Sequence, residues 1–412
     1  MSEIGSALGV GSIWRRRCLP LAWPVLGWAV GHIAWGHAGI AQITVVLALP
    51  MLWSLASKRL EAAALMLGYF LASARGLPAG AVVFFGDSAP AWWGLAMWLS
   101  ASLLLALPFM ALWRPTGWGR AAGFAAALVV VAAPPIGIVG WTNPITVAGV
   151  LYPMSGWVGI GLTLGVFVVL AMGRRKAGLA LTAATMALVS VVNSDPPAAA
   201  PPGWQGFDTQ FAGLSSARAD DAGQVLAAMD RIRWLERAIA DMPRDATLVL
   251  PETVLGRFDG AGQALLDQSE QELRHKGSRV LVGAELPIEG SSRYLNAVVV
   301  LGAQQADSRA ALQGIPVPIS MWKPWADDGA QGDLLGRSSV IQVGAQRVAA
   351  AVCYEQLLTY SMLKLMSERP SVLVAVSNVW WARATSIPEI QDQSVRAYAR
   401  LFDVPAVFAR NR

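Results

Sequence analysis

Charged residues, cysteine and histidine are all scarce in this sequence. Only 14% of its 412 residues are Asp, Glu, Lys or Arg, whereas 55% are hydrophobic, which excludes an ordinary soluble composition. Its two cysteines, Cys18 and Cys353, are far apart in the chain, and we expect no disulfide between them. Of three histidines only His275 follows the apolar half, which argues against Ser-His-Asp and Cys-His hydrolases and against a zinc site. The sequence implies no metal and no cofactor.

The hydrophobic residues are concentrated before Asn193, and ordinary polar density returns after it. We therefore predict a membrane domain over 1–193, a linker rich in proline and alanine over 194–206, and a water-soluble domain over 207–412. The membrane domain has seven apolar stretches long enough to cross a bilayer, at 18–37, 39–57, 60–77, 90–113, 121–141, 154–172 and 177–193. Gly161 and Gly165 are spaced to let another helix approach closely.

The loops between these stretches alternate in charge. Basic residues precede the first stretch and fill every second loop after it: Arg15, Arg16, Arg17, Lys58, Arg59, Arg114, Arg120, Arg174, Arg175 and Lys176. Basic loops face the cytoplasm, so the N-terminus is expected there. Seven crossings then place the water-soluble domain on the far side of an inner membrane, in the periplasm. The sequence pI of about 9.5 thus reflects topology, and we predict no nucleic-acid binding.

The water-soluble domain alternates apolar strands with amphipathic helices, which is typical of an α/β fold. We expect strands at 206–214, 247–250, 280–283, 297–301, 340–343, 348–352, 372–376 and 406–408, and helices at 225–241, 264–276, 356–368 and 390–401. In such folds the functional side chains gather beyond the carboxyl ends of the strands.

Three chemically useful side chains are expected at strand ends. Glu252 lies just past one strand, Cys353 is at the end of another, and Lys323 lies between two tryptophans with a proline after it. Together they suffice for acyl transfer: the thiolate attacks a carbonyl, the glutamate moves the proton, and the ammonium stabilises the oxyanion. Each has a plainer interpretation when taken alone. Glu252 can begin a helix, Lys323 can be a surface charge, and Cys353 can be a small buried hydrophobe.

The order Pro251-Glu252, Lys323 and Cys353-Tyr354-Glu355 resembles the carbon–nitrogen hydrolase (nitrilase) superfamily. That superfamily carries a Glu-Lys-Cys triad on an α-β-β-α sandwich, which implies Glu252, Lys323 and Cys353 as the triad. The apolar N-terminal half narrows the resemblance to the apolipoprotein N-acyltransferase branch. Further matching segments are Ser377-Asn378 with Trp381, Gly283 with Tyr294 and Asn296, and Gln391–Arg396 with Pro405 and Arg410-Asn411.

The resemblance implies a polytopic α-helical membrane domain followed by a nitrilase-like α/β domain. It also implies accessory roles for Tyr354, Glu355, Asn378 and Trp381. In place of a further active-site glutamate of that branch the chain offers Asp327 or Asp328. The shortened C-terminal end and the segment from Met321 to Trp325 are similar to conjugal-transfer members.

The three side chains predict acyl transfer or amide hydrolysis, and the resemblance implies a place in plasmid conjugation. The expected substrate is a membrane lipid or a protein close to the lipid, and the expected partners are proteins of the conjugation apparatus. Two alternatives stay open. One is a non-catalytic component of that apparatus, and the other is an apolipoprotein N-acyltransferase.

Overall fold

The computed structural model describes residues 8–37, 39–193, 198–211, 222–336 and 339–412. The side chains of 8–20, with those of Arg15, Arg16, Arg17 and Cys18, lie outside this description, as do 194–197 of the expected linker. The chain forms two compact units, one made mainly of helices and the other, 153–156 with 193–384 and 391–412, built around β-sheets. One of the limits between the two units falls at Asn193.

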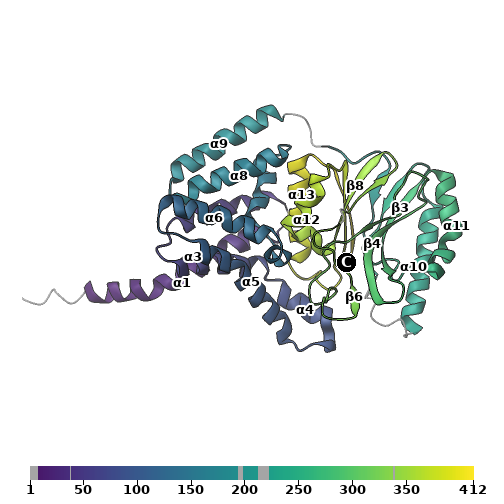
Figure 1. Ribbon diagram of the computed structural model, residues 1–412, viewed down its shortest axis with the longest axis horizontal. Helices are drawn as coiled ribbons and strands as arrows, with labels where there is room; N and C mark the ends of the chain where they lie inside the picture. Colours follow the sequence, from purple (N-terminus) through teal and green to yellow (C-terminus); the bar gives the residue numbers. More distant parts are fainter. Residues whose placement is uncertain (1–7, 38, 194–197, 212–221, 337–338) are drawn as a thin grey trace, which may run out of the picture. The chain divides into compact units, whose positions relative to one another are not determined.

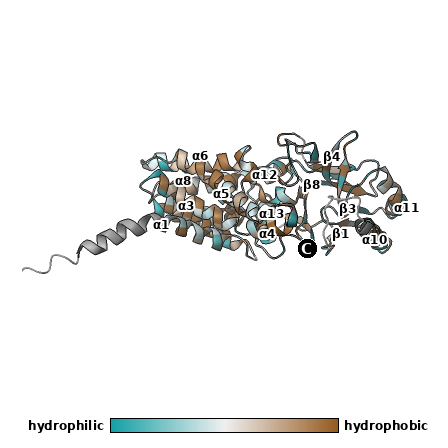
Figure 2. Cartoon of the chain, turned by 90° about the horizontal axis from the view of Figure 1, so that it is seen from below, coloured by the Kyte–Doolittle hydropathy of each residue, from teal (hydrophilic) through white to brown (hydrophobic). Residues whose placement is uncertain are grey.

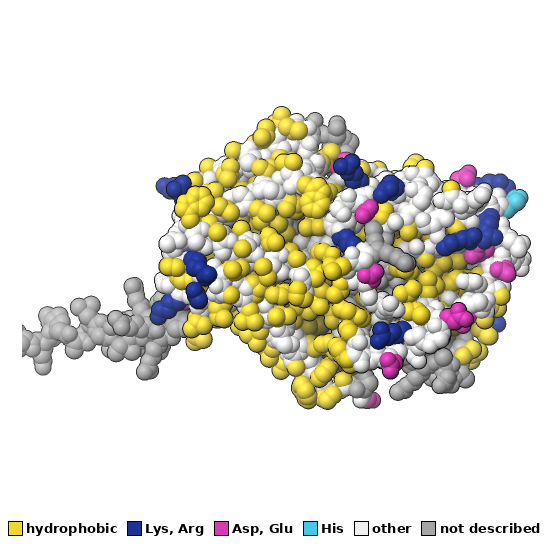
Figure 3. All heavy atoms as spheres, in the orientation of Figure 1, with side chains coloured by type: hydrophobic (Ala, Val, Ile, Leu, Met, Phe, Trp, Pro, Cys, Tyr) yellow, Lys and Arg dark blue, Asp and Glu magenta, His cyan; other side chains and the backbone are white. Residues whose placement is uncertain are grey.

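The helical unit carries most of the apolar surface. Figure 2 shows its helices as predominantly hydrophobic, and Figure 3 shows few charged side chains over them. Its elements are α1 (Leu8–Ala34), η1 (Ala41–Leu47), α2 (Ala48–Trp53), α3 (Arg59–Ser73), α4 (Leu77–Phe85), η2 (Gly86–Ser88), α5 (Trp92–Leu112), α6 (Gly117–Ala132), η3 (Ile136–Val139), η4 (Pro144–Val147), α7 (Ala148–Leu151), α8 (Gly156–Ala171) and α9 (Arg175–Val192).

Two helices among the described residues, α5 and α9, are long and apolar enough to cross a membrane. Two bent pairs, α3 with α4 at 46° and Pro144–Leu151 with α8 at 119°, raise this number to four if each pair forms one span. The apolar helices at Leu21–Ala34, Ala41–Trp53 and Gly117–Ala132 are shorter. Seven crossings and the orientation derived from them therefore stay predictions.

One expectation for this unit is wrong in detail, and for another the described residues offer no partner helix. The stretch 121–141 is not one helix: α6 ends at Ala132, just before Pro134, and the chain continues as 3₁₀ turns because the residue before a proline disfavours helix. At Gly161 and Gly165 an added Cβ would meet no heavy atom within 4 Å, so no described helix packs closely there.

The second unit is an α/β domain, as expected. Its first sheet has the order β1-β2-β3-β4-β5, with β6 on β4, and its second has the order β10-β9-β8-β7. The elements are β1 (Trp204–Gly206), α10 (Ala222–Ala240), β2 (Thr247–Val249), α11 (Gly260–Lys276), β3 (Arg279–Pro287), β4 (Ser292–Leu301), β5 (Ala310–Leu312), β6 (Asp328–Ala330), β7 (Val340–Val343), β8 (Gln346–Val352), η5 (Cys353–Leu357), α12 (Thr359–Ser367), β9 (Val372–Asn378), α13 (Ile387–Phe402) and β10 (Ala406–Asn411).

Apolar side chains hold these elements in four layers (Figure 1). Valine and alanine side chains from the two sheets, such as Val298 on β4 and Val352 on β8, interlock in one core. Leu235 of α10 and Leu273 of α11 pack on the other face of the first sheet. On the second sheet α12 packs against β8, and the Tyr398 hydroxyl donates to Thr359 Oγ1 at 3.0 Å, joining α13 to α12. The order of layers is therefore helix, sheet, sheet, helix.

Both β2 and β8 lie in parallel parts of their sheets. β2 runs parallel to β1 and β3, and β8 runs parallel to β9. Because both sheets bury valine and alanine against each other, a residue just beyond β2 can meet one just beyond β8. Glu252 and Cys353 occupy these positions.

Candidate active site

Cys353 lies at a sharp change of backbone direction. The buried strand β8 ends at Val352, and the 3₁₀ turn η5 begins at the cysteine. Its φ angle is +47°, a left-handed conformation that a residue other than glycine seldom adopts without support from its surroundings. The side chain is buried, with 6% of its surface exposed. The strand and the turn thus fix where the sulfur points.

Glu252 is held equally firmly. It follows β2 and is only 3% exposed, and the next residue, Thr253, has a φ of +65°. Its Oε1 accepts a hydrogen bond from Asn296 Nδ2 at 2.7 Å, and its Oε2 accepts one from the main-chain N–H of Asn378 at 3.0 Å. Both carboxylate oxygens therefore have donors, which offsets part of the cost of burying a charge.

Glu252 and Cys353 form a thiol–carboxylate pair. The Cys353 thiol donates a hydrogen bond to the Glu252 carboxylate. Burial raises the pKa of Glu252 while its hydrogen bonds lower it, and the net direction is upward. Burial, and next the charge of Glu252, raise the pKa of Cys353 well above its usual value. The resting thiol is protonated beside a carboxylate made more basic by burial, which suits proton transfer in the reaction.

Lys323 is not at a strand end, where we expected it. It lies in the long loop between β5 and β6. Its Nζ forms an ion pair with Asp328 Oδ2 at 3.2 Å, and 31% of the side chain is exposed. Among the described residues, its hydrogen bonds and ion pairs include neither Glu252 nor Cys353. Asp328, one of the two aspartates expected to replace a family glutamate, is thus engaged with the lysine.

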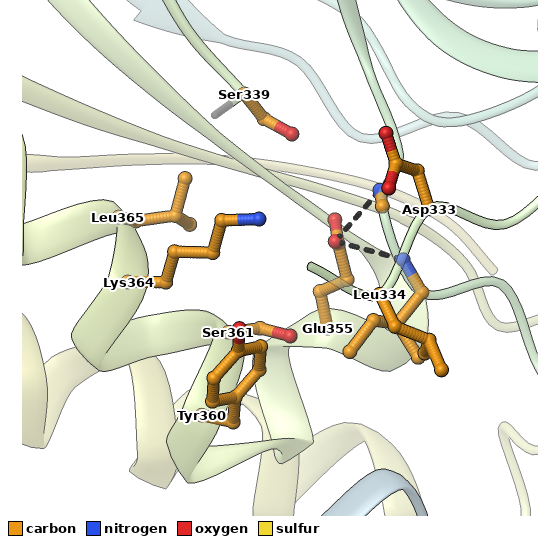
Figure 4. Close-up of a pocket in the computed structure, with 10 residues that line it drawn as sticks. Asp333, Leu334, Ser339, Glu355, Tyr360, Ser361, Lys364 and Leu365 are labelled. Carbon is orange, nitrogen blue, oxygen red and sulfur yellow. Dashed lines mark hydrogen bonds between the residues drawn. The ribbon is translucent and has the colours of Figure 1, made fainter. Parts of the chain in front are cut away.

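Glu355 supports the turn that carries Cys353. Its Oε1 accepts from the main-chain N–H groups of Gly314 at 3.0 Å and Ile315 at 3.2 Å, and its Oε2 accepts from that of Val352 at 3.3 Å. The carboxylate borders a cavity of about 20 Å³, room for about one water molecule. Figure 4 shows the Lys364 side chain extending into the same cavity. Glu355 therefore ties the segment after β5 to the end of β8, an accessory role consistent with its predicted position.

Glu355 should also make the stability of this unit depend on pH. Burial raises its pKa from 4.5 to about 7. A folded-state pKa above the unfolded one stabilises the fold below pH 4.5, and this contribution is lost as pH rises through 7. Across this pH range the free energy of unfolding falls by about 3 kcal/mol. We expect the wild-type unfolding temperature of the full chain to fall between pH 5 and pH 8 by more than that of Glu355→Gln. Equal slopes in the two proteins would contradict this.

Of the other expected accessory residues, Asn378 contacts the pair through its main chain. Its N–H binds Glu252, and its side-chain oxygen accepts from Asn411 Nδ2 at 3.0 Å. Trp381 Nε1 donates to the Asn378 carbonyl at 3.1 Å, which fixes the turn after β9. Tyr354 is buried next to Cys353 in η5. Asn378 and Trp381 therefore position the backbone donor beside Glu252.

Three amides complete the site, and the sequence alone assigned none of them a role. Asn296 Nδ2 also donates to Gln313 Oε1 at 2.8 Å, and Gln313 Nε2 donates to the Val352 carbonyl at 2.9 Å. Gln391 Nε2 donates to the Cys353 carbonyl at 2.9 Å. A polar residue inside an apolar strand, as Asn296 is in β4, was the available signal. In the described part of the chain no three His, Cys, Asp or Glu side chains gather to hold a metal ion.

Comparison with known proteins gives two long matches. The chain is 33% identical over 436 residues to the conjugal transfer protein TraB of Agrobacterium fabrum strain C58, covering 98% of each. It is also 33% identical to a probable conjugal transfer protein TraB of Sinorhizobium fredii strain NGR234, covering 93% of this chain and 95% of that one.

No protein-family model matches the chain. Among solved structures, a mutant amidase from Nesterenkonia sp. AN1 is 12% identical and covers 50% of this chain and 78% of its own, with a TM-score of 0.32. A TM-score of this size does not define a shared fold.

Proposed function

Because the chain belongs to the TraB family of conjugal transfer proteins, we propose that it is a membrane-anchored thiol enzyme acting in plasmid conjugation. It transfers or hydrolyses an acyl group through a thioester on Cys353. The observation that carries this proposal is the buried pair of Cys353 and Glu252 beyond β8 and β2. A buried thiol that donates a hydrogen bond to a carboxylate with a raised pKa provides the nucleophile and the base of covalent acyl transfer.

The reaction has two halves. First, Glu252 removes the thiol proton as the sulfur attacks the substrate carbonyl, and a sulfur–carbon bond forms. The bond to the leaving amine or alcohol then breaks, and protonated Glu252 returns the proton to that group. In the second half Glu252 removes a proton from an incoming amine or water, which attacks the thioester, and the proton passes back to the departing sulfur. Each half conserves atoms and charge, and no oxidant or metal takes part.

Lys323 retains its proposed role as the cation that stabilises the oxyanion. Its ammonium pairs with Asp328 in this structure, and we propose that it exchanges this partner for the carbonyl bound at Cys353. Both partners are partly exposed, and exposed ion pairs contribute only about 0–1 kcal/mol. The exchange of Asp328 for a developing oxyanion in a buried site is therefore favourable.

The apolar helices of the first unit suggest where the substrate comes from. We propose that these helices face lipid and that the acyl donor or acceptor is a membrane lipid or a protein beside the lipid. We further propose an inner-membrane location with the N-terminus in the cytoplasm and the catalytic unit in the periplasm. Other conjugation proteins are the expected partners.

A non-catalytic role in assembling the conjugation apparatus is the second candidate. The observation in its favour is that Lys323 pairs with Asp328, and that among the described residues no cation contributes to the pKa shifts of Glu252 and Cys353. In that case the polar network around Glu252 serves only to stabilise the fold.

Mass spectrometry distinguishes the two candidates. The full-length protein is purified from donor cells in native lipid, digested, and searched for an acyl adduct on the Cys353 peptide. If the protein is an enzyme, the wild type carries an adduct that Cys353→Ala lacks. Hydroxylamine removes this adduct, because it cleaves thioesters. An unmodified thiol in cells that are actively transferring plasmid, also after trapping in acid, would falsify the thioester.

A further inference from the structure

Gln391 has an unusual set of contacts for a buried glutamine. It lies on α13 with 2% of its surface exposed. Its Nε2 donates to the Cys353 carbonyl at 2.9 Å, and the same side chain hydrogen-bonds the Cys353 sulfur. Within the described residues its Oε1 is buried and has no hydrogen-bond partner. One amide group thus contacts both the backbone and the reacting atom of the proposed nucleophile.

The orientation of this amide follows from its partner. A carbonyl oxygen can only accept, so the end of Gln391 that faces the Cys353 carbonyl has to be the NH₂ group. The Oε1 then points away from that carbonyl and has no donor among the described residues. Burying an acceptor without a donor is unfavourable.

A second N–H group lies beside the same atoms. The main-chain N–H of Asn378 binds Glu252 Oε2 at 3.0 Å and also contacts the Cys353 sulfur. The charge of Glu252 acts against a thiolate, whereas these two donors favour it. Lys323, the cation expected at this site, is paired with Asp328. Among the described residues, the donors that reach the sulfur are thus two amides.

We infer that Gln391 is a catalytic residue, whose side-chain amide stabilises the Cys353 thiolate by a hydrogen bond to the sulfur while anchoring the cysteine backbone. The inference deepens the proposed function and rests on it, because a stabilised thiolate matters only if Cys353 is the nucleophile. When Glu252 takes the thiol proton, negative charge moves to the sulfur and strengthens the bond from Gln391. The donor is preorganised for the charge that develops in the reaction.

Thiol alkylation tests this without knowledge of the substrate. The rate of Cys353 labelling by iodoacetamide is measured on the full-length protein from pH 6 to pH 10 by intact mass, in a Cys18→Ala background. Gln391→Met fills a similar volume without a donor, and we expect it to lower the rate at pH 7 about tenfold and to move the pH profile up by about one unit. Gln391→Glu places a second carboxylate beside the sulfur and should react more slowly still.

The matched control is Gln393→Met. Gln393 is also buried on α13, but it is not among the groups that hydrogen-bond the Cys353 sulfur. We expect its pH profile to equal that of the wild type, even if its unfolding temperature falls. Wild-type profiles for both Gln391 variants, each shown to be folded by circular dichroism, would overturn the inference. This readout needs no turnover, so it decides the role of Gln391 separately from the search for an acyl adduct.

Discussion

Conjugal transfer falls about a thousandfold or more when Cys353 is replaced by alanine, if the thiol is the nucleophile of the reaction. Glu252→Gln lowers it by nearly as much. Burial is the largest cause that raises the pKa of Cys353, so even without the charge of Glu252 the thiol stays protonated near pH 7 and has no base to take its proton. Because the two groups act in one step, the double variant loses no more than Cys353→Ala alone. The measurement is the number of transconjugants per donor cell.

The control for this experiment is an acidic residue away from the pair. Glu289 is exposed in the turn between β3 and β4, and Glu289→Gln should transfer at the wild-type frequency. Protein amounts are compared by immunoblot, since a variant that is degraded would also fail to transfer. Undiminished transfer by Cys353→Ala at normal protein level would instead identify the protein as a non-catalytic component of the apparatus.

The strands and helices of the second unit could largely be predicted because hydrophobic periodicity reports burial directly. The strand expected at 340–343 is observed as β7 at those residues. The predicted helices are observed with ends that differ by a few residues. The structure adds β5 and β6, of three residues each. β6 is Asp328-Gly329-Ala330, which has no apolar pattern and pairs with β4 through the backbone. Such a strand exists only because its neighbour is already in place.

Two further errors have local causes. The strand expected at 206–214 is three residues, Trp204–Gly206, because pairing with β2 stops at Val249; residues 212–214 lie outside the description. The helix expected from Gln356 begins at Thr359, after the 3₁₀ turn that Cys353 starts. A left-handed cysteine is imposed by tertiary contacts, and helix propensity carries no information about it.

The pairing of Glu252 with Cys353 was predictable in outline, because both follow apolar strands of one α/β domain. The surrounding amides were not. Asn296 donates to Glu252 from β4, and Gln391 donates to the Cys353 carbonyl from α13. Nothing local in the sequence indicates which buried amide will find which partner. The position of Lys323 was misjudged for the same reason, since it depends on how a long loop folds back on β4 through β6.

Gly283→Ala should strongly destabilise this unit. An added Cβ would lie 2.3 Å from Glu252 Cα and 2.4 Å from Thr253 N. Both are backbone atoms, so no side-chain rotation relieves the contact. The two segments are also tied by main-chain hydrogen bonds, from the Gly283 N–H to the Pro251 carbonyl at 3.0 Å and from the Leu255 N–H to the Gly283 carbonyl at 3.1 Å. We expect a destabilisation of about 3 kcal/mol and an unfolding temperature lower by roughly 6–12 °C.

The close approach at Gly283 has a functional consequence as well. Glycine lets the chain after β2 lie directly on β3. That contact fixes the position of the Glu252 carboxylate relative to Cys353. Gly283→Ala should therefore slow transfer and remove the acyl adduct even at temperatures where the protein is folded, since a displacement of about 1 Å can cost a hundredfold in rate. Gly260→Ala is the matched control, because a Cβ at Gly260, in the first turn of α11, meets nothing within 4 Å. An unfolding temperature for Gly283→Ala equal to that of Gly260→Ala would show that β3 and the Glu252 segment separate freely, and that glycine is not what places the base.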